Sequence, residues 1–592
     1  MGRGQALWVW LAILAAVGTP AVVVAAPYAS NVVKTGTTVN FILNEPADAL
    51  SYSINGGAAV ALDATTKGAK SFTLPSTTAM FSITAEKNAA VGYSIPTGVT
   101  VALIAAGLSQ DSREGGLNII SDDANLLTRF NSPRGVSVSN NPNAPHFGTA
   151  YITNSAAGSV SDGDPPAVVR TLIGEGVYAL RADQSDAFGL GDTATNPTVE
   201  GFPAWNTTSA NSPFRATVAD DGNVYVTDWS DVSGSLIRVS PDLMTGTNVL
   251  AGFGGTQPLP AGQNHGSISG AHIEGSIAGG NLTVYTIDED LTTAHVTGSG
   301  STGDQNSLWR YDIGSGPLPS SALPSKIADE LIPIASSDVT RGADGKFYMT
   351  QYRFDGNQVG LVVTDADGAP LFNSLAVTRE MLGNPTAPDI LRNVQGVAVS
   401  EDQNWLAIPI TNSDVAVVPL IDGIPDLANR LVVNTGTDVN FGRDIAFDAA
   451  GNIHFVSSGQ ARYRVLAPGG HTQATTSFNG TTFDFDVVTI GGGGDNADFD
   501  NDGDVDGDDF LTFQRGFGQP GDRADGDANS DQIVNADDLA VFQSQFGTVP
   551  AAPATAAVPE PTTWALAALA AVVCVITALP RRRAALVRVK AR

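Results

Sequence analysis

Cysteine is almost absent from this 592-residue chain, which contains one, Cys574. Since an internal disulfide needs two cysteines, the fold must be held by core burial, with bound metal as the other available source of stability. Cationic side chains are also scarce: 31 Lys and Arg face 60 Asp and Glu, which gives a net charge of −29. Nucleic-acid binding relies on clustered Lys and Arg, so this balance argues against nucleic acid as a partner.

Long stretches of helical periodicity are missing from most of the chain. Glycine is plentiful at 64 residues, and charged residues make up 15% of the sequence. Short alternating apolar runs separated by glycine-containing turns predict a mainly β protein. The length predicts several domains rather than one core.

The N-terminus carries an export signal. Arg3 precedes an apolar run from Ala6 to about Val24, which small residues follow. This arrangement predicts a secretory signal peptide within residues 1–29, with the mature chain starting near Ala26 or Ser30.

The C-terminus has three consecutive parts: a linker at 548–563, an apolar segment at 564–579 and a basic tail at 580–592. The apolar segment predicts a transmembrane helix, and the arginines predict a cytoplasmic end. Pro559-Glu560-Pro561, the apolar segment and the arginine cluster together resemble the PEP-CTERM sorting signal of bacterial surface proteins. This resemblance implies recognition by exosortase-type sorting machinery and a cell-surface or extracellular location. A plain membrane anchor is the alternative.

Residues 31–107 contain alternating runs such as 38–43, 50–54 and 81–84, and Asn55-Gly56-Gly57 indicates a hairpin turn. They predict a small β-sandwich, which resembles the Ig-like modules of extracellular bacterial proteins.

From 121 to 490 a strand, a glycine turn and a second strand recur. Asp221-Gly222, Asp344-Gly345 and Gly451-Asn452 mark three of these turns, and variants lie near 135–152, 279–287 and 396–408. The spacing predicts four-stranded blades. The units resemble NHL and YVTN-type β-propellers. The six units predict six blades, or seven if the interval 134–214 contains another.

Residues 495–547 contain 14 Asp, no Glu and two Arg. Within them, two 12-residue stretches have the register of a calcium loop, with oxygen ligands at positions one, three, five and twelve. A solvated acidic tail is the alternative, but the register repeats. The predicted side-chain ligands are Asp498, Asp500, Asp502 and Asp509 in the first loop, and Asp527, Asn529, Asp531 and Asp538 in the second.

Each loop leads into an amphipathic helical pattern that a glycine closes, at 509–518 and 538–547. The pair resembles a type I dockerin, which implies two Ca²⁺ sites completed by the carbonyls of Asp504 and Ile533. It also implies a cohesin-like or other surface protein as partner. Gln532 replaces the glycine at position six of the second loop, so this site should bind calcium more weakly.

These features predict an exported, surface-sorted binding or assembly protein, with the propeller as a scaffold that presents loops or binds a ligand. One alternative is a secreted polysaccharide-degrading or lactonase-type enzyme, for which paired carboxylates at the propeller axis would be needed. The candidate cluster in the sequence is His265, His272 and residues 288–290. A further alternative is a matrix component that binds exopolysaccharide.

Overall fold

The computed structural model divides the chain into two compact units, Met1–Gly491 and Gly492–Arg592. The residues that the structure describes are 26–90, 118–122, 124–162, 168–188, 212–229, 236–250, 267–289, 307–316, 324–329, 331–332, 336–352, 358–391, 393–410, 414–434, 442–467, 472–489, 497, 499, 505–519, 526, 528, 534 and 536–546.

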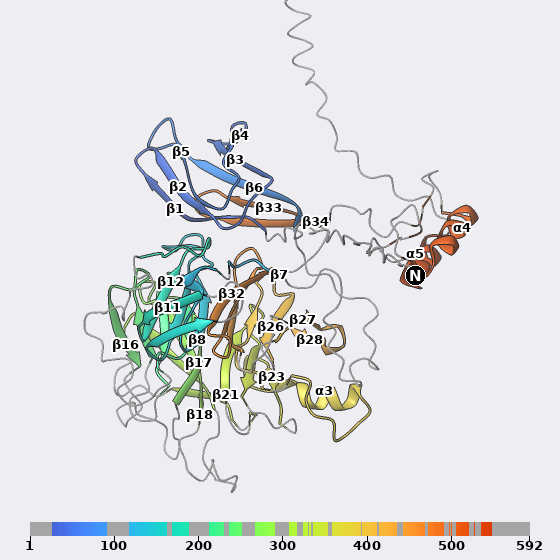
Figure 1. Cartoon of the computed structure of the whole chain (residues 1–592). Helices are drawn as coiled ribbons and strands as arrows, with labels where there is room; N and C mark the ends of the chain where they lie inside the picture. The colour runs from blue at the N-terminus through green and yellow to red at the C-terminus, as the bar shows by residue number, and fades with distance from the viewer. Residues whose placement is uncertain are drawn as a thin grey trace, which may run out of the picture. The chain divides into compact units, whose positions relative to one another are not determined.

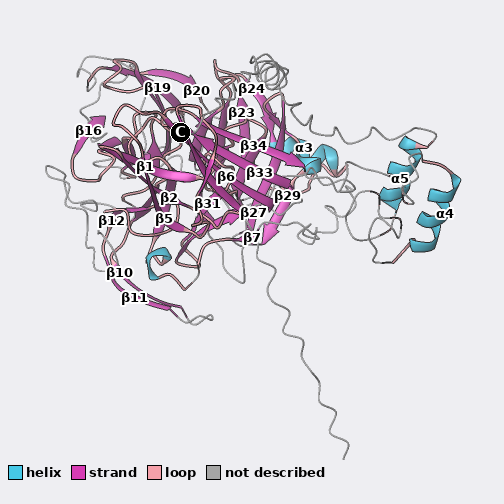
Figure 2. Ribbon diagram, turned by 90° about the horizontal axis from the view of Figure 1, so that it is seen from above, coloured by secondary structure: helices cyan, strands magenta, loops and turns pink. Residues whose placement is uncertain are grey.

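The first unit contains a β-sandwich made from both ends of that unit (Figures 1 and 2). One sheet has the order β1-β2-β5, with β1 (Ala29–Thr35), β2 (Thr38–Leu43) and β5 (Gly68–Thr73). The other has the order β34-β33-β6-β3-β4, with β3 (Ala49–Ile54), β4 (Val60–Ala61), β6 (Phe81–Ala90), β33 (Thr472–Phe478) and β34 (Phe483–Thr489). Buried Phe41 and Phe72 of the first sheet share a core with Leu50, Ile83 and Phe478 of the second.

The sandwich boundary differs from the prediction at its C-terminal side. The sequence pattern assigned 121–490 to the propeller, but β33 pairs with β6, from Thr472 opposite Ala90 to Phe478 opposite Ile83. Residues 472–489 therefore complete the sandwich that 26–90 begin. The pairing joins segments almost 400 residues apart in sequence, so local periodicity carries no sign of it. The Ig-like character of the module stays a prediction.

Six sheets of the first unit, counted over its described residues, are arranged as blades. Their strands, in chain order, are β8 (Pro133–Val138), β9 (Ala150–Asn154) and β12 (Gly176–Leu180) in blade one; β13 (Ala216–Val218), β14 (Val224–Thr227), β15 (Leu236–Val239) and β16 (Gly246–Leu250) in blade two; and β17 (Ser267–Glu274), β18 (Leu282–Glu289), β19 (Leu308–Gly314) and β20 (Ser325–Ala328) in blade three. Between β9 and β12, the strands β10 (Gly158–Asp162) and β11 (Val168–Ile173) pair as a separate two-stranded sheet.

The remaining blades continue the same pattern. Their strands are β21 (Ser336–Arg341), β22 (Phe347–Gln351), β23 (Leu361–Thr364) and β24 (Pro370–Asn373) in blade four; β25 (Ala398–Val399), β26 (Trp405–Pro409), β27 (Asp414–Ile421), β28 (Ile424–Pro425) and β29 (Leu431–Asn434) in blade five; and β30 (Gly442–Phe447), β31 (Ile453–Ser457), β32 (Arg462–Ala467) and β7 (Asn118–Ile119) in blade six. Within the described ranges of this unit, three short helices lie between strands: η1 (Leu126–Thr128), α3 (Ser374–Met381) and η3 (Leu427–Asn429).

The blades close into a ring, which establishes a β-propeller. The innermost strands β8, β13, β17, β21, β25 and β30 each neighbour the next, and β30 neighbours β8. The outer edge of blade six is completed by β7, where Ile119 pairs with Leu466 of β32. Chain segments from both ends of the propeller thus share one sheet, which joins the start of the propeller to its last blade.

Local turn chemistry explains why the inner hairpins form. All six strand–turn–strand units predicted from the sequence are hairpins of the propeller. Gly222, Gly345 and Gly451 have φ values of +80°, +87° and +76°, which glycine adopts without steric cost. The strands that follow are almost wholly buried, because each blade packs between two others.

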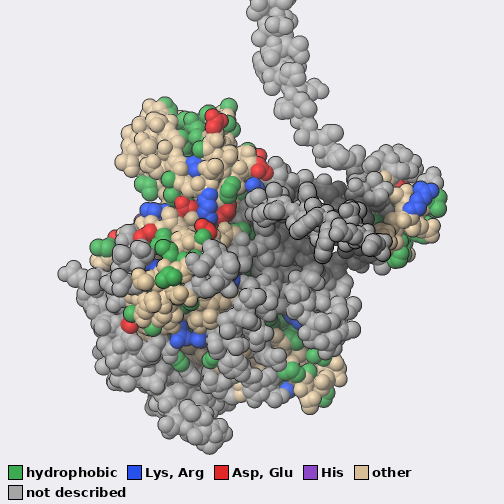
Figure 3. Space-filling model, viewed as in Figure 1, with side chains coloured by type: hydrophobic (Ala, Val, Ile, Leu, Met, Phe, Trp, Pro, Cys, Tyr) green, Lys and Arg blue, Asp and Glu red, His purple; other side chains and the backbone are tan. Residues whose placement is uncertain are grey.

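The sandwich is fastened to the propeller by the turn between β8 and β9. Phe147 of this turn enters the sandwich core, with ring centroids 5.9 Å from Tyr28 and 5.3 Å from Phe483. The Asn31 backbone N–H donates to the Phe147 carbonyl over 2.8 Å. Charged side chains of both signs gather at this junction in Figure 3, and Lys67 and Glu45 form an ion pair there at 2.8 Å. The two modules therefore share one buried interface.

The described part of the second unit contains two helices, α4 (Gly507–Gly516) and α5 (Ala536–Gln545). Both overlap the predicted helical patterns, and Gly518 adopts a φ of +79° just after α4, as its predicted capping role requires. None of the helices in the described ranges is long and apolar enough to cross a membrane. The predicted signal peptide core and the apolar segment 564–579 lie outside those ranges.

Candidate functional site

The helical unit is an internal repeat with a shared core. Its buried apolar side chains occur in matched pairs 29 residues apart, such as Val505 with Val534 and Phe513 with Phe542. The Val534 backbone also bonds to the end of the first repeat, since Gly518 N–H donates to its carbonyl over 2.7 Å. The two repeats therefore pack as one small module.

The last predicted ligand of each calcium loop is buried in this module. Asp509 and Asp538 are 1% and 0% exposed. Asp509 Oδ1 accepts from the Phe499 N–H at 2.6 Å, and Asp538 Oδ1 accepts from the Ala528 N–H at 2.7 Å. Phe499 and Ala528 hold position two of their loops, so the repeats make the same bond. Each carboxylate folds its loop back onto the start of its helix.

The chemistry of these two carboxylates fits calcium. A carboxylate has about four lone-pair sites, so one that accepts from a backbone amide can still coordinate a cation. A buried carboxylate is costly unless positive charge compensates it. The 495–547 segment supplies 14 Asp and only two Arg, so a bound cation is the natural source of that charge.

The other predicted ligands lie outside the described residues. They are Asp498, Asp500, Asp502, Asp504, Asp527, Asn529, Asp531 and Ile533. Among the residues that the structure does describe, no group of three or more His, Cys, Asp or Glu side chains is placed to hold a metal. The predicted Ca²⁺ sites therefore stay predictions, with their last ligands in matching environments.

The second candidate site is the propeller axis. One residue of each blade occupies an equivalent position near the start of its inner strand, at or just before its regular pairs. In blade order these residues are Gly135, Arg215, Gly270, Asp338, Gly396 and Asp444. Charged residues thus alternate with glycine around the ring.

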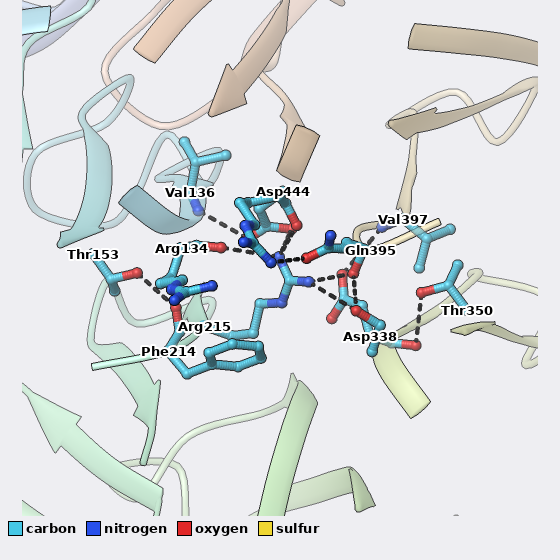
Figure 4. A network of polar contacts seen from close by, with 12 residues as sticks. Arg134, Val136, Thr153, Phe214, Arg215, Asp338, Thr350, Gln395, Val397 and Asp444 are labelled. Carbon is cyan, nitrogen blue, oxygen red and sulfur yellow. Dashed lines mark hydrogen bonds and ion pairs between the residues drawn. The ribbon is translucent and has the colours of Figure 1, made fainter. Parts of the chain in front are cut away.

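Arg215 lies at the centre of this ring and is 2% exposed (Figure 4). Its Nη1 pairs with Asp444 Oδ1 at 2.9 Å and donates to the Arg134 carbonyl at 3.1 Å. Its guanidinium also donates to the carbonyls of Arg443 and Gln395. Arg215 therefore ties the inner strands of blades one, two, five and six together.

The two axial aspartates bond to the backbone of the following blade. Asp444 Oδ2 accepts from the Val136 N–H at 2.8 Å, and Asp338 Oδ2 accepts from the Val397 N–H at 3.1 Å. Burial raises the pKa of Asp338 to about 8, and it also raises the pKa of Asp444. Asp444, whose Oδ1 lies 2.9 Å from Arg215 Nη1, is the carboxylate that pairs directly with this guanidinium.

A cavity of about 390 Å³ extends from this ring toward the turns of the inner hairpins. Its wall is more polar than apolar: beside aliphatic residues such as Val136 and Val397 it carries the carboxyl groups of Asp220 and Glu401 and the hydroxyls of Thr217 and Thr340. His272 of the predicted histidine–carboxylate cluster also lines it. Two carboxylates do meet at the axis, as the enzyme alternative requires. Both already bond to backbone amides, and one is paired with Arg215.

The predicted histidine–carboxylate cluster does not assemble around the described side chains. His272 lies on β17, where its Nε2 is 3.7 Å from Glu274. Asp288 is buried near the other end of the same hairpin, where its Oδ1 accepts from the Ser307 N–H. The strand register places Asp288 opposite Ile268 and His272 opposite Tyr285, so the two belong to opposite ends of the sheet. His265 and residue 290 lie outside the described ranges.

No family model and no curated protein sequence matches this chain. Solved structures with similar folds include a Bacteroides thetaiotaomicron protein of unknown function, with 11% identity, a TM-score of 0.33 and coverage of 75% of this chain and 98% of that one. The WD40 β-propeller domain of Doa1 has 9% identity and a TM-score of 0.33, and covers 60% and 97%. A virginiamycin B lyase from Staphylococcus aureus has 13% identity and a TM-score of 0.30, and covers 63% and 89%. The propeller assignment rests on the ring of six sheets.

Proposed function

We propose that this chain is an exported, surface-sorted binding and assembly protein whose helical module is held together by two calcium ions and attaches the chain to a surface protein. The observation that carries the proposal is the matched pair of buried carboxylates, Asp509 and Asp538, at the last position of two calcium-loop registers. Their duplication would have no reason in a solvated acidic tail.

Calcium acts in this proposal as a structural latch. A metal that binds the folded module but not the unfolded one stabilises it by mass action. Aspartate rather than glutamate at position twelve suits extracellular-grade affinity, with a Kd on the order of 10⁻⁴ M. At about 1 mM calcium such a site adds roughly 1.4 kcal/mol to the stability of the module.

The propeller and sandwich form the part that the module attaches. The axial cavity gives the propeller room for a small ligand, and the buried junction at Phe147 makes the sandwich and propeller one body. Both predicted ends of the precursor, the signal peptide and the PEP-CTERM-like tail, support export and exosortase-type sorting.

Hydrogen exchange on the purified full chain tests the calcium latch locally. Amides of 507–516 and 536–545 should exchange about tenfold more slowly in 1 mM calcium than in chelator, which corresponds to roughly 1.4 kcal/mol. Asp509→Asn and Asp538→Asn should each remove most of this protection. Asp484→Asn, at an exposed position on β34, is the matched control and should leave it unchanged.

Unchanged exchange in both helices, with and without calcium, would refute the latch. The assembly role has a separate test, in which the exported proteins of the same cells are captured on the immobilised chain. A partner that is retained in calcium and released by chelator supports attachment through the helical module. A partner that stays bound in the presence of chelator would show that attachment occurs elsewhere on the chain.

A further inference from the structure

The end of the propeller axis opposite the cavity carries a concentration of arginine. Arg134 and Arg443 precede the axial positions of blades one and six, and these two blades are neighbours in the ring. Each guanidinium is held in the same way: Arg134 Nε donates to Ser155 Oγ at 3.0 Å, and Arg443 Nε donates to Ser458 Oγ at 2.7 Å. Equivalent bonds in equivalent blades fix both side chains.

This arrangement brings hydrogen-bond donors close together, since Arg443 feels the charge of Arg134 and Tyr352 acts on both arginines. Among the described residues, the bond to Ser155 is the only hydrogen bond that the Arg134 guanidinium makes, so its Nη donors are available. Arg443 Nη1 donates to Gln395 Oε1 at 2.7 Å, which fixes the orientation of that amide. Gln395 is 2% exposed, yet its Nε2 has no hydrogen-bond partner. A buried donor without an acceptor is costly and calls for a ligand.

The local charge also favours an anion. Three arginines meet here, since Arg215 donates to the backbone carbonyls of both Arg134 and Arg443. Asp444 neutralises Arg215, and Asp338 is largely protonated at neutral pH because burial raises its pKa to about 8. Burial and the neighbouring positive charges lower the pKa of Arg134 and of Arg443. A negatively charged ligand would offset both the burial of these guanidiniums and the repulsion between them.

We propose that Arg134, Arg443 and Gln395 bind a small oxyanion at this end of the axis, the chemistry that a carboxylate shares with a phosphate or sulfate group. The planar fork of a guanidinium matches the oxygens of such groups, and Arg134 has its Nη donors for this contact. Arg443, which already bonds to Ser458, Gln395 and Tyr352, orients the Gln395 amide and adds positive charge. Tyr352 of blade four adds an aromatic ring 5.9 Å from the Arg443 guanidinium carbon. These side chains come from blades one, five and six, and the aromatic ring of Tyr352 comes from blade four. A bound group would therefore contact blade one and blade six, where the propeller closes.

Calorimetric titration of the full chain at constant ionic strength tests the proposal. The probes are phosphate, sulfate, acetate and glucuronate, with chloride as the reference anion. At least one probe should bind with a stoichiometry of one and with an affinity that falls as salt rises. A tetrahedral preference would indicate a phosphate or sulfate source, and a preference for glucuronate over acetate would indicate an acidic sugar.

Variants locate the binding. Arg134→Gln and Arg443→Gln should each weaken the affinity about tenfold to hundredfold, because the first removes charge-assisted hydrogen bonds and the second removes a positive charge and the bond that orients Gln395. Arg134→Lys keeps the charge, so it should retain part of the affinity. Arg310→Gln removes an exposed arginine that is paired with Asp312, and it should leave the affinity unchanged. Absence of binding by every oxyanion to the wild-type chain, or equal binding by Arg134→Gln, would overturn the proposal.

Discussion

Replacing Arg215 with methionine should destabilise the propeller more than any change at its surface. Methionine keeps much of the length of the side chain but removes the charge and every donor. Asp444, which is 3% exposed, then has no cation at 2.9 Å, and the carbonyls of Arg134, Arg443 and Gln395 each lose a donor. Removal of one partner from a buried ion pair costs about 3–5 kcal/mol.

The contribution of the Arg215–Asp444 ion pair to stability can be measured separately from the contribution of side-chain packing. Asp444→Asn in the Arg215→Met background removes the orphaned charge, while the asparagine Oδ1 can still accept from the Val136 N–H. The double variant should therefore be more stable than Arg215→Met alone, with a coupling of roughly 1–3 kcal/mol. Lower pH should reduce the difference in unfolding free energy between the wild type and Arg215→Met, because protonation of Asp444 also removes its unpaired charge.

Urea unfolding of the full chain, followed by tryptophan fluorescence, measures these differences. Trp229, Trp309 and Trp405 all lie in the blades, so the signal reports the propeller. Arg238→Met on β15, away from the axis, is the control and should change the stability by no more than about 0.5 kcal/mol. A loss below about 1 kcal/mol for Arg215→Met, or strict additivity in the double variant, would refute the argument that Arg215 is the electrostatic centre of the ring.

Two further predictions concern the axis and the N-terminus. Asp338 has a folded-state pKa of about 8 against an ordinary 3.8, so the folded chain holds a proton that the unfolded chain releases, and stability from this group falls as pH rises from about 4 to about 8. The unfolding free energy of Asp338→Asn, relative to that of the wild type, should therefore be higher at pH 8 than at pH 5 in urea unfolding. The same difference between the two proteins at both pH values would contradict the raised pKa. The mature chain should begin at Ala26 rather than Ser30, because Tyr28 is fully buried and bonds through its N–H to Asn44 Oδ1 at 2.6 Å. N-terminal sequencing of the exported protein decides between the two, and a chain that starts at Ser30 should lose about 3–5 kcal/mol of stability.

The hairpins of the propeller could be predicted because their signals are local. Asp221-Gly222, for example, places a glycine with positive φ between two runs of β-branched and aromatic residues. Helices α4 and α5 were also predictable, since their apolar faces and the closing Gly518 lie within ten residues of one another. The return of β33 and β34 to the sandwich was not predictable, because its partner strand β6 lies almost 400 residues earlier and nothing in the local pattern identifies it.

The axial residues could have been found from the sequence only by aligning the six hairpins with one another. Arg215, Asp338 and Asp444 then fall in one column, with Gly135, Gly270 and Gly396 between them. Taken one at a time, these residues resemble ordinary charged residues and turn glycines. Their role at the axis depends on contacts with the neighbouring blade, which the local sequence does not show. The sequence-based search for histidines and motifs instead selected His272 and Asp288, which the strand register separates.

The alternation around the axis has a steric cause that links these six positions. A Cβ on Gly135 would lie 2.9 Å from Arg215 Cα, one on Gly270 would lie 2.7 Å from Asp338 Cα, and one on Gly396 would lie 2.8 Å from Asp444 Cα. Each charged residue can therefore approach the axis only because the preceding blade has glycine beside it. Asp444 then reaches forward to the Val136 N–H and joins the last blade to the first. The contacts that close the propeller are therefore also the contacts that bury the axial charges. A side chain introduced at Gly396 should consequently disturb the ion pair between Arg215 and Asp444 as well as the local strand.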